Sequence, residues 1–265
     1  MLKIDGRAIA QKIINELKNK PTPNKILAAV FVGDNPASQS FLKIKERTAR
    51  ELSVNFQLHH FPTTISQEEL EKTIEQLNKE ASVGGIIVQL PLPEKFDRDR
   101  VLKVLNPKKD VDALSEESLV EAPVVGVVKV VLEDLGVKIK DLGEIVVVGR
   151  GLLVGGPIIK WLEQERLEIK DFPPEADPPS AERFKVADSK TENLAEFLSD
   201  VDLVITGVGK RDLIKFDWIK DGAVAVDFGF PPDLNLNNLK SEILNLKSGY
   251  WTPTPGGTGP ILVAM

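Results

Sequence analysis

The sequence contains no cysteine, and this absence removes several kinds of chemistry at once. Without thiols the chain cannot form disulfide bonds, a cysteine nucleophile or a cysteine-ligated metal site. Histidine is nearly as scarce, because the only two are the adjacent His59 and His60. A serine–histidine–aspartate triad or a histidine metal site would have to draw on this one pair. We therefore predict neither a hydrolytic triad nor a metal centre.

An excess of positive charge and long apolar runs are missing as well. The chain has 34 Lys and Arg against 40 Asp and Glu, which gives a formal net charge of −6 and a pI near 5.2. This balance disfavours nucleic acid as the main partner. The apolar runs are too short to cross a bilayer, and the amino terminus has no signal-peptide pattern. We expect no membrane association and take the cytoplasm as the location.

The composition that remains is that of a globular protein. The chain has 265 residues, of which 42% are hydrophobic and 28% charged, enough for one large or two ordinary domains. Apolar patterns predict alternating strands and helices in the first half. The expected helices cover residues 6–18 or begin at Asn35, Ser66 and Asp97, and the expected strands cover 26–32, 54–61 and 85–90.

The second half repeats this alternation. Strands are expected over 145–148, 184–187, 202–206 and 223–227, helices over 124–135 and 191–198 and directly after the 149–157 loop, and an exposed proline-rich loop over 172–180. Strands that alternate with helices are typical of parallel, doubly wound sheets. We predict an α/β fold of two domains, with residues 1–119 and 251–265 in one and a Rossmann-like domain over 120–250.

One helix start combines features that suit a ligand. Asn35 is a good N-cap and Pro36 suits the first helical position. Phe41 and Lys45 are four residues apart, so they share one face of that helix. The helix follows a buried strand, and open α/β sheets bind ligands at the carboxyl ends of their strands. An aromatic ring beside an amine can hold a flat heterocycle and move a proton there; a core phenylalanine with a solvated lysine is the alternative.

Glycines in the second half indicate a phosphate-binding turn. The loop at Gly149, Arg150 and Gly151 lies between a predicted strand and helix, where backbone amides can approach a phosphate, although a tight turn fits the spacing equally well. Thr206 and Gly207 end another strand and suit the ribose or nicotinamide of a dinucleotide, or a plain turn. The segment 188–191 gives a mixed signal: its acidic residue favours a free ribose hydroxyl, whereas Ser189 and Lys190 suit a 2′-phosphate.

Three further stretches carry polar groups at special places. Gln89 ends a buried strand, where its amide either caps the sheet or faces a ligand. Asp110 and Asp112 alternate sides if their stretch is extended, so one can face a ligand while the other does not. The glycine-rich segment 252–260 is too rigid for an element interior and has the form of a shaped loop, suited to wrap a ligand or to act as a tether.

These stretches resemble one known family, the bifunctional methylenetetrahydrofolate dehydrogenase/methenyltetrahydrofolate cyclohydrolases. The matching segments run in order along almost the whole chain: 32–38 (VGDNPAS), 88–93 (VQLPLP), 109–112 (KDVD), 148–150 (VGR), 154–155 (VG) and 252–260 (TPTPGGTGP). The resemblance implies a folate-binding catalytic domain and an NAD(P)-binding domain. It also implies a reduced folate substrate, NADP with NAD as the alternative, and a homodimer. The implied reactions are oxidation of methylenetetrahydrofolate and hydrolysis of the methenyl product.

The resemblance also implies roles for individual residues. Lys45 matches the catalytic lysine, Gln89 the amide that hydrogen-bonds it, and Asp112 the carboxylate that anchors the pterin. The remaining matches are substrate-binding positions at Phe41, Pro255, Gly256 and Gly257, and cofactor-binding positions at Gly149, Arg150, Gly151, Ser189, Lys190, Thr206, Gly207 and Phe230. Because Arg150, Ser189 and Lys190 suit a 2′-phosphate, we favour NADP.

The chain departs from the family pattern at several of these positions. Phe41 stands where the family has a tyrosine, and Gly151 where it has a serine. The segment after Asp112 is shorter than in the family, and the proline-rich 172–180 region is longer. These losses keep two alternatives open: a dehydrogenase whose cyclohydrolase step is weak or lost, and a non-catalytic relative that binds cofactor or folate.

Overall fold

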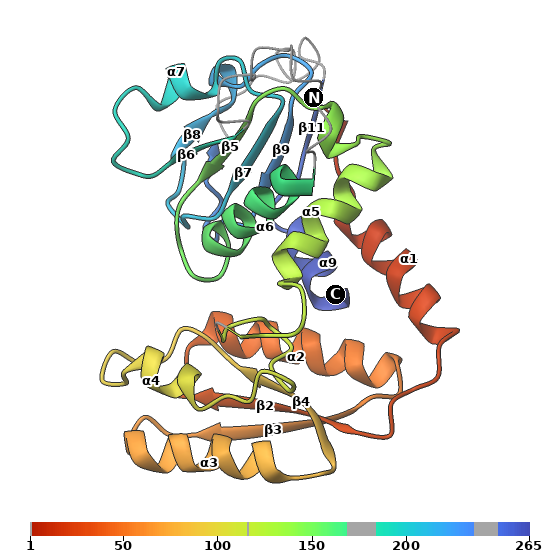
Figure 1. Ribbon diagram of the computed structural model, residues 1–265, viewed down its shortest axis with the longest axis vertical. Helices are drawn as coiled ribbons and strands as arrows, with labels where there is room; N and C mark the ends of the chain where they lie inside the picture. Colours follow the sequence, from red (N-terminus) through yellow and green to blue (C-terminus); the bar gives the residue numbers. More distant parts are fainter. Residues whose placement is uncertain (1, 116, 169–183, 236–248) are drawn as a thin grey trace. The chain divides into compact units, whose positions relative to one another are not determined.

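The computed structural model describes residues 2–115, 117–168, 184–235 and 249–265. The chain forms two compact units (Figure 1). We call residues Lys12–Pro123 the first unit, and residues Met1–Gln11 with Val124–Val263 the second unit. The expected loop at 172–180 lies outside the described residues.

A three-stranded parallel sheet is the centre of the first unit. Its strands are β2 (Ile26–Val32), β3 (Asn55–Phe61) and β4 (Val83–Val88), in the order β3-β2-β4. The helices between and after them are α2 (Pro36–Glu51), α3 (Gln67–Lys79) and α4 (Arg98–Lys103). The predicted parallel α/β arrangement is confirmed, and β4 begins and ends two residues earlier than expected.

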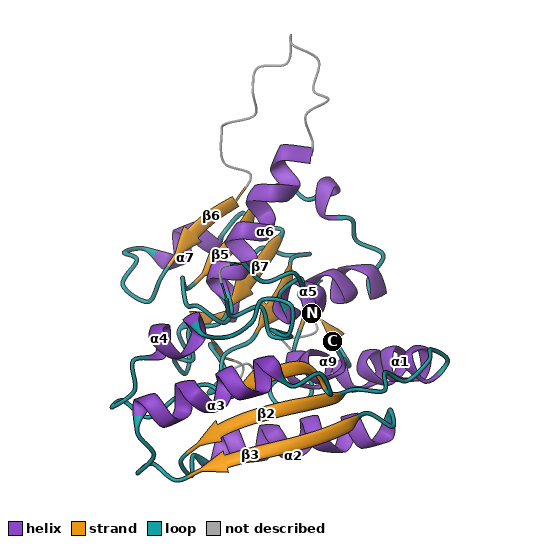
Figure 2. Cartoon of the chain, turned by 60° about the horizontal axis from the view of Figure 1, so that its bottom comes forward, coloured by secondary structure: helices purple, strands orange, loops and turns teal. Residues whose placement is uncertain are grey.

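Strand β2 is buried on both faces, as its continuous apolar sequence indicates. Ala28, Val30 and Val32 pack with residues of α3, whereas Ala29 and Phe31 pack with Leu42 of α2. The two helices therefore cover opposite faces of the sheet (Figure 2). All five strand residues are at most 2% exposed, so β2 is a rigid base for the helix that follows it.

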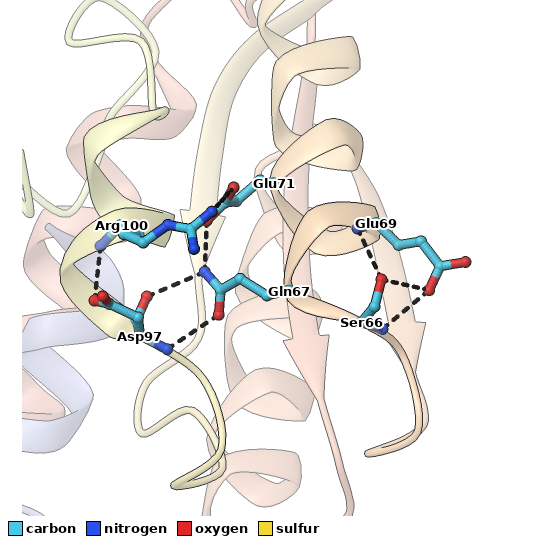
Figure 3. A network of polar contacts seen from close by, with 6 residues as sticks. All are labelled: Ser66, Gln67, Glu69, Glu71, Asp97 and Arg100. Atoms are coloured by element: carbon cyan, nitrogen blue, oxygen red, sulfur yellow. Dashed lines mark hydrogen bonds and ion pairs between the residues drawn. The ribbon is translucent and has the colours of Figure 1, made fainter.

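Polar caps fix where the helices of this unit begin. The Asn35 side chain accepts from the Ser38 amide at 3.0 Å, and Ser66 forms the predicted capping box with Glu69. Figure 3 shows this box beside a second network that ties α3 to α4. There Gln67 bonds the backbone of Asp97 through both ends of its amide, and the networked side chains also include Glu71 and Arg100.

The second unit contains a six-stranded parallel sheet. Its strands are β1 (Leu2–Lys3), β5 (Ile145–Val148), β6 (Phe184–Ala187), β7 (Leu203–Thr206), β9 (Val224–Asp227) and β11 (Tyr250–Trp251), in the order β1-β11-β9-β7-β5-β6. A short pair joins β8 (Ile214–Lys215) to β10 (Leu234–Asn235). Helix α1 (Gly6–Lys18) begins in this unit and continues into the first unit at Lys12. The other helical segments are α5 (Pro123–Asp134), η1 (Ile139–Asp141), α6 (Gly155–Glu168), α7 (Leu194–Leu198), η2 (Phe216–Trp218) and α9 (Thr258–Ala264).

The strand order places a topological switch point at β5. The chain moves from β5 to β6 on one side and then returns to β7 on the other side. Open α/β sheets bind ligands at such a point, beyond the carboxyl ends of the strands. The loops after β5 and β7 are therefore the expected ligand loops of this unit.

Both ends of the chain join the second unit, which differs from the expected division. Strand β1 pairs with β11, and β11 pairs with β9, so residues 2–3 and 250–251 extend the six-stranded sheet. The sequence patterns predict one domain of residues 1–119 and 251–265. Backbone pairing between residues about 250 positions apart has no local signal in the sequence, and this accounts for the difference.

Candidate functional site

Lys45 lies on α2 between an aromatic ring and a carboxylate. Its Nζ is 5.4 Å from the centroid of the Phe41 ring and 3.2 Å from Oδ2 of Asp112. The side chain of Lys45 is 13% exposed and that of Asp112 is 26% exposed. The expected face shared by Phe41 and Lys45 is present, and the ion pair is partly sheltered from water. A sheltered pair with some exposure can exchange partners with a ligand more readily than a buried one.

Gln89 directly follows β4 and holds its own loop. Its Nε2 donates to the carbonyl oxygen of Leu90 at 2.7 Å. Its Oε1 is buried and has no hydrogen-bond partner among the described residues. Lys45 instead bonds Asp112, so the expected hydrogen bond between Lys45 and Gln89 is not the one that this structure forms. A buried acceptor without a donor is costly, so Oε1 is suited to receive a donor when a ligand binds.

Asp110 organises the turn that carries Asp112. It is 1% exposed, and its Oδ2 accepts from both the amide and the hydroxyl of Ser115, each at 2.7 Å. Ala113 in this turn has a φ of 54°, a left-handed conformation that is unfavourable for a residue with a Cβ. The two aspartates thus take opposite roles, as alternation predicts: Asp110 faces inward, and Asp112 faces Lys45.

The loop after β5 has the geometry of a phosphate-binding turn. Gly149 has a φ of 105°, and a Cβ on Gly155 would overlap the carbonyl oxygen of Gly149. These two glycines let the chain turn sharply into α6, whose first amides follow at once. Arg150 and Gly151 are exposed in the turn. The Gly156 amide already donates to the Gly151 carbonyl oxygen at 3.0 Å, and Pro157 has no amide hydrogen. A phosphate group at this turn would therefore be attracted mainly by the positive end of the helix dipole and by the exposed Arg150.

The residues after β6 form a compact turn. The Asp188 carboxylate accepts from the Lys190 amide at 2.7 Å and from the Thr191 hydroxyl at 3.3 Å. The acidic group is thereby engaged within its own turn. Ser189 and Lys190 are exposed, so their side chains are accessible to a ligand.

The loop after β7 depends on a residue that the sequence analysis did not single out. Thr206 is 0% exposed and its hydroxyl donates to Oδ2 of Asp233 at 2.7 Å, so this side chain supports the loop from inside. Asp233 also accepts from the amides of Val208 at 2.8 Å and Lys210 at 2.7 Å. Gly207 lies against Val154, since a Cβ there would be 2.6 Å from Cγ1 of that residue.

A second buried carboxylate lies close by. Asp227 is 1% exposed at the end of β9 and accepts from the amides of Gly229 at 2.6 Å and Leu234 at 3.0 Å. Burial, with a smaller contribution from the Asp233 charge, raises the pKa of Asp227 to about 6. The segment between the two aspartates carries Phe230, which is 75% exposed. An aromatic ring so exposed is available to a ligand.

The glycine-rich loop before α9 is closely packed at one end. Pro255 is exposed, while Gly257 is buried. A Cβ on Gly6 would overlap the carbonyl oxygen of Gly257, and Gly256 has a φ of 99°. Gly6 is a further residue without a signal in the sequence, because its role depends on this close approach.

The described part of the chain contains no cluster of three or more His, Cys, Asp or Glu residues that could hold a metal ion. None of its helices is long and apolar enough to span a membrane.

These features define a class of protein: one α/β unit with a lysine–carboxylate pair, and a second unit with a doubly wound parallel sheet and a glycine turn before a helix. Two family models match this chain. The catalytic domain of tetrahydrofolate dehydrogenase/cyclohydrolase matches residues 4–112, and the NAD(P)-binding domain of the same enzymes matches residues 122–265. The chain belongs to the tetrahydrofolate dehydrogenase/cyclohydrolase family, as the sequence motifs predicted.

Individual relatives cover the whole length. The bifunctional protein FolD of Nitratiruptor sp. is 31% identical over 284 residues, with 99% of this chain and 94% of that protein covered. The FolD structure from Campylobacter jejuni is 29% identical with a TM-score of 0.82, covering 100% and 95% of the two chains. A Trypanosoma brucei FolD complexed with NADP and an inhibitor is 26% identical with a TM-score of 0.83, covering 99% and 93%.

Proposed function

We propose that this chain oxidises methylenetetrahydrofolate to methenyltetrahydrofolate with NADP and then hydrolyses the product to formyltetrahydrofolate. The family membership supports both reactions, and the sheltered pair of Lys45 and Asp112 beside Phe41 is the observation that carries the hydrolytic one. NADP is the preferred cofactor because Ser189 and Lys190 are exposed and the Asp188 carboxylate is engaged within its turn.

In the first reaction, a bound nicotinamide would supply the acceptor for a hydride from the methylene carbon of the folate. No proton leaves that carbon in this step, so the protein needs to supply alignment and not a base. The turn at Gly149, Arg150 and Gly151 would hold the cofactor phosphates, and the loops carrying Gly207 and Phe230 would border the rest of the cofactor. Pro255, Gly256 and Gly257 are proposed as substrate-binding positions.

In the second reaction, water adds to the methenyl carbon and loses a proton before the ring opens. We propose that Lys45, in its neutral form, takes this proton. The positive charge of the methenyl folate would repel an ammonium group beside it, so the neutral form of the lysine is favoured when this folate is bound. Asp112, released from Lys45, would accept hydrogen bonds from the pterin. Gln89 would then orient the lysine through its buried, unpartnered Oε1.

A dehydrogenase with a weak cyclohydrolase step is the second candidate, and Phe41 favours it. The family's tyrosine offers a hydroxyl beside the lysine, which a phenyl ring cannot replace. The same losses leave a non-catalytic binding relative as a third outcome.

Two assays on the purified protein separate these candidates. In the first, methylenetetrahydrofolate is mixed with NADP or NAD, and the reduced nicotinamide is followed by absorbance. In the second, the decay of methenyltetrahydrofolate is followed without cofactor, with the uncatalysed decay in buffer subtracted. Activity in both assays supports the proposal. Activity in the first assay alone identifies a monofunctional dehydrogenase. If neither assay shows activity, both enzymatic proposals are contradicted.

A homodimer and a cytoplasmic location stay predictions of the family resemblance. Sedimentation equilibrium of the purified chain tests the first, and fractionation of cells that express it tests the second.

A further inference from the structure

We propose that Asp233 is a positioning residue for the dehydrogenase reaction, because its buried carboxylate holds the loop after β7 in the shape that binds the nicotinamide half of the cofactor. This inference rests on the proposed function. It assigns a role to a residue that touches neither the phosphate turn nor the lysine site.

The carboxylate of Asp233 joins three points of one loop. Oδ2 accepts from the Thr206 hydroxyl and the Val208 amide, and Oδ1 accepts from the Lys210 amide, all between 2.7 and 2.8 Å. The donors lie 23 to 27 residues earlier in the sequence. Asp233 is 0% exposed, so no water competes for these bonds. Both carboxylate oxygens are thus engaged, and the loop backbone has one arrangement that satisfies them.

The held loop touches two other ligand segments of the same unit. A Cβ on Gly149 would be 3.1 Å from the Val208 side chain, which places the loop against the phosphate turn. A Cβ on Gly209 would be 3.4 Å from the carbonyl oxygen of Phe230, which places it against the exposed aromatic residue. A shift of this loop would therefore displace both neighbours.

The strand order assigns this loop to one half of a dinucleotide. In dinucleotide-binding sheets the pyrophosphate lies at the first glycine turn, and the adenine ribose lies near the residue that follows the next strand. These positions correspond to the turn after β5 and the segment after β6. The nicotinamide half then extends toward the opposite side of β5, where β7 and β9 end.

A buried charge is a costly way to hold a loop, which argues for a purpose beyond stability. Two carboxylates, Asp227 and Asp233, lie buried within one small region, and neither forms an ion pair with a described residue. Charge-assisted hydrogen bonds are shorter and more directional than neutral ones, so they fix geometry closely. Negative charge at this edge also favours the positively charged oxidised nicotinamide over the neutral reduced form.

The test compares Asp233→Asn with Asp202→Asn in the full chain. An asparagine at 233 must turn an NH2 group toward one of the loop donors, which removes a bond and sets donor against donor. Asp202 is the control, since it also bonds a loop amide, that of Gly143 at 2.7 Å, but stands before β7 at the opposite end of the strand. It also pairs with Lys220 at 2.7 Å, so Asp202→Asn loses a stabilising contact as well, away from the proposed cofactor loops. Thr206→Val is a milder variant that removes only one bond.

We expect Asp233→Asn to raise the Kd for NADP at least tenfold. We also expect it to lower the ratio of the Kd for the reduced cofactor to the Kd for the oxidised cofactor. In the cofactor-free protein, we expect hydrogen exchange at the Val208 and Lys210 amides to become at least tenfold faster. Asp202→Asn should leave all three quantities within twofold of wild type, and decay of methenyltetrahydrofolate should continue in every variant.

Unchanged exchange at Val208 and Lys210 in Asp233→Asn would overturn the proposal, because the loop would then be held without the carboxylate. Equal weakening of NADP binding by Asp202→Asn would overturn it too, since the effect would be general destabilisation. If Asp233→Asn does not fold, Thr206→Val decides through the same exchange measurement. A wild-type protein that binds neither NADP nor NAD refutes the proposed cofactor. Hydrogen exchange at the Val208 and Lys210 amides would still test whether Asp233 holds the loop.

Discussion

The two units use the same residue, aspartate, in opposite ways. In the first unit, Asp112 is partly exposed and faces the ammonium group of Lys45. In the second unit, Asp227 and Asp233 are almost fully buried and face backbone amides and one hydroxyl. An ammonium on a flexible stem can leave its partner when a ligand arrives, whereas an amide fixed by neighbouring strands cannot.

The comparison shows how a ligand-facing carboxylate differs from a supporting one. The two kinds differ in the exposure of the carboxylate and in the mobility of the group that donates to it. Proximity to the site alone does not distinguish them. Asp110 makes the point within the first unit, because it lies two residues from Asp112 and yet is buried against Ser115. The predictions below test each side of this contrast.

The largest effect on activity is expected when the ammonium group of Lys45 is removed. Lys45→Met should lower the rate of methenyltetrahydrofolate hydrolysis at least about a hundredfold, since a positioned general base contributes about that much or more. Folate binding, measured by titration, should stay within about threefold. Lys43→Met on the same helix is the control, because Lys43 is exposed. Equal loss of hydrolysis and folate binding would show that Lys45 binds substrate and is not the base.

The buried carboxylate of Asp227 predicts that the stability of the folded chain depends on pH. The pKa of Asp227 is raised from 3.8 to about 6 in the folded chain. Between these values the folded state binds more protons than the unfolded state, so this group's contribution to stability falls as pH rises and is nearly gone by about pH 7. A shift of roughly two units corresponds to about 3 kcal/mol.

The Asp227→Asn variant isolates this contribution. The stability of wild type relative to the variant should fall by about 2 kcal/mol as the pH rises from 4 to 7, which is most of the full effect. Urea unfolding followed by tryptophan fluorescence measures it, because Trp161, Trp218 and Trp251 all lie in the second unit. A difference that is constant over this range would contradict the raised pKa.

A smaller effect is expected at the aromatic residue of the lysine site. Phe41→Tyr should raise the cyclohydrolase rate by about two- to tenfold, the range that one added hydrogen bond supplies. The dehydrogenase rate should not change, because no proton moves in that step. Phe56→Tyr serves as a control for the added hydroxyl elsewhere in the same unit. Turnover that does not improve would argue against a hydroxyl role at position 41.

The smallest effect concerns the strained turn that carries Asp112. Ala113→Gly should stabilise the first unit by about 0.5–1 kcal/mol, because the left-handed cost of about 1–2 kcal/mol exceeds the entropy cost of glycine. Ala81→Gly is the control; its φ is not positive, so only the entropy cost applies and stability should fall. Thermal unfolding measures both, and a loss of stability in Ala113→Gly would show that the turn is not strained.

Local patterns in the sequence were enough to predict most strands and helices and part of the candidate site. The alternation of strands and helices, the capping residues and the shared face of Phe41 and Lys45 all depend on neighbours a few residues apart. The partner of Gln89 could not be obtained in this way, because the choice between Lys45 and the Leu90 carbonyl depends on side-chain rotamers in a packed loop.

Asp233 is the clearest example of a residue whose role could not be predicted from the sequence. It stands after two prolines in a segment with no periodic pattern, and its three donors are more than twenty residues away. The Asp110–Ser115 bond lies close in sequence, yet the burial of Asp110 depends on the bridge to Ile86 of β4. Burial decides whether a carboxylate binds ligand or holds backbone, and burial is a property of the assembled fold.

The sequence by itself determined the family and the alternation of the main strands and helices, and it supplied the residues that we propose for the chemistry. Each of these follows from residue identity and short spacings, which act before any distant parts meet. Only the tertiary structure decided that both chain ends extend the six-stranded sheet, that Lys45 pairs with Asp112, and that Asp227 and Asp233 are buried. These outcomes depend on contacts between residues far apart in the chain, which form only when the strands pair and water is excluded.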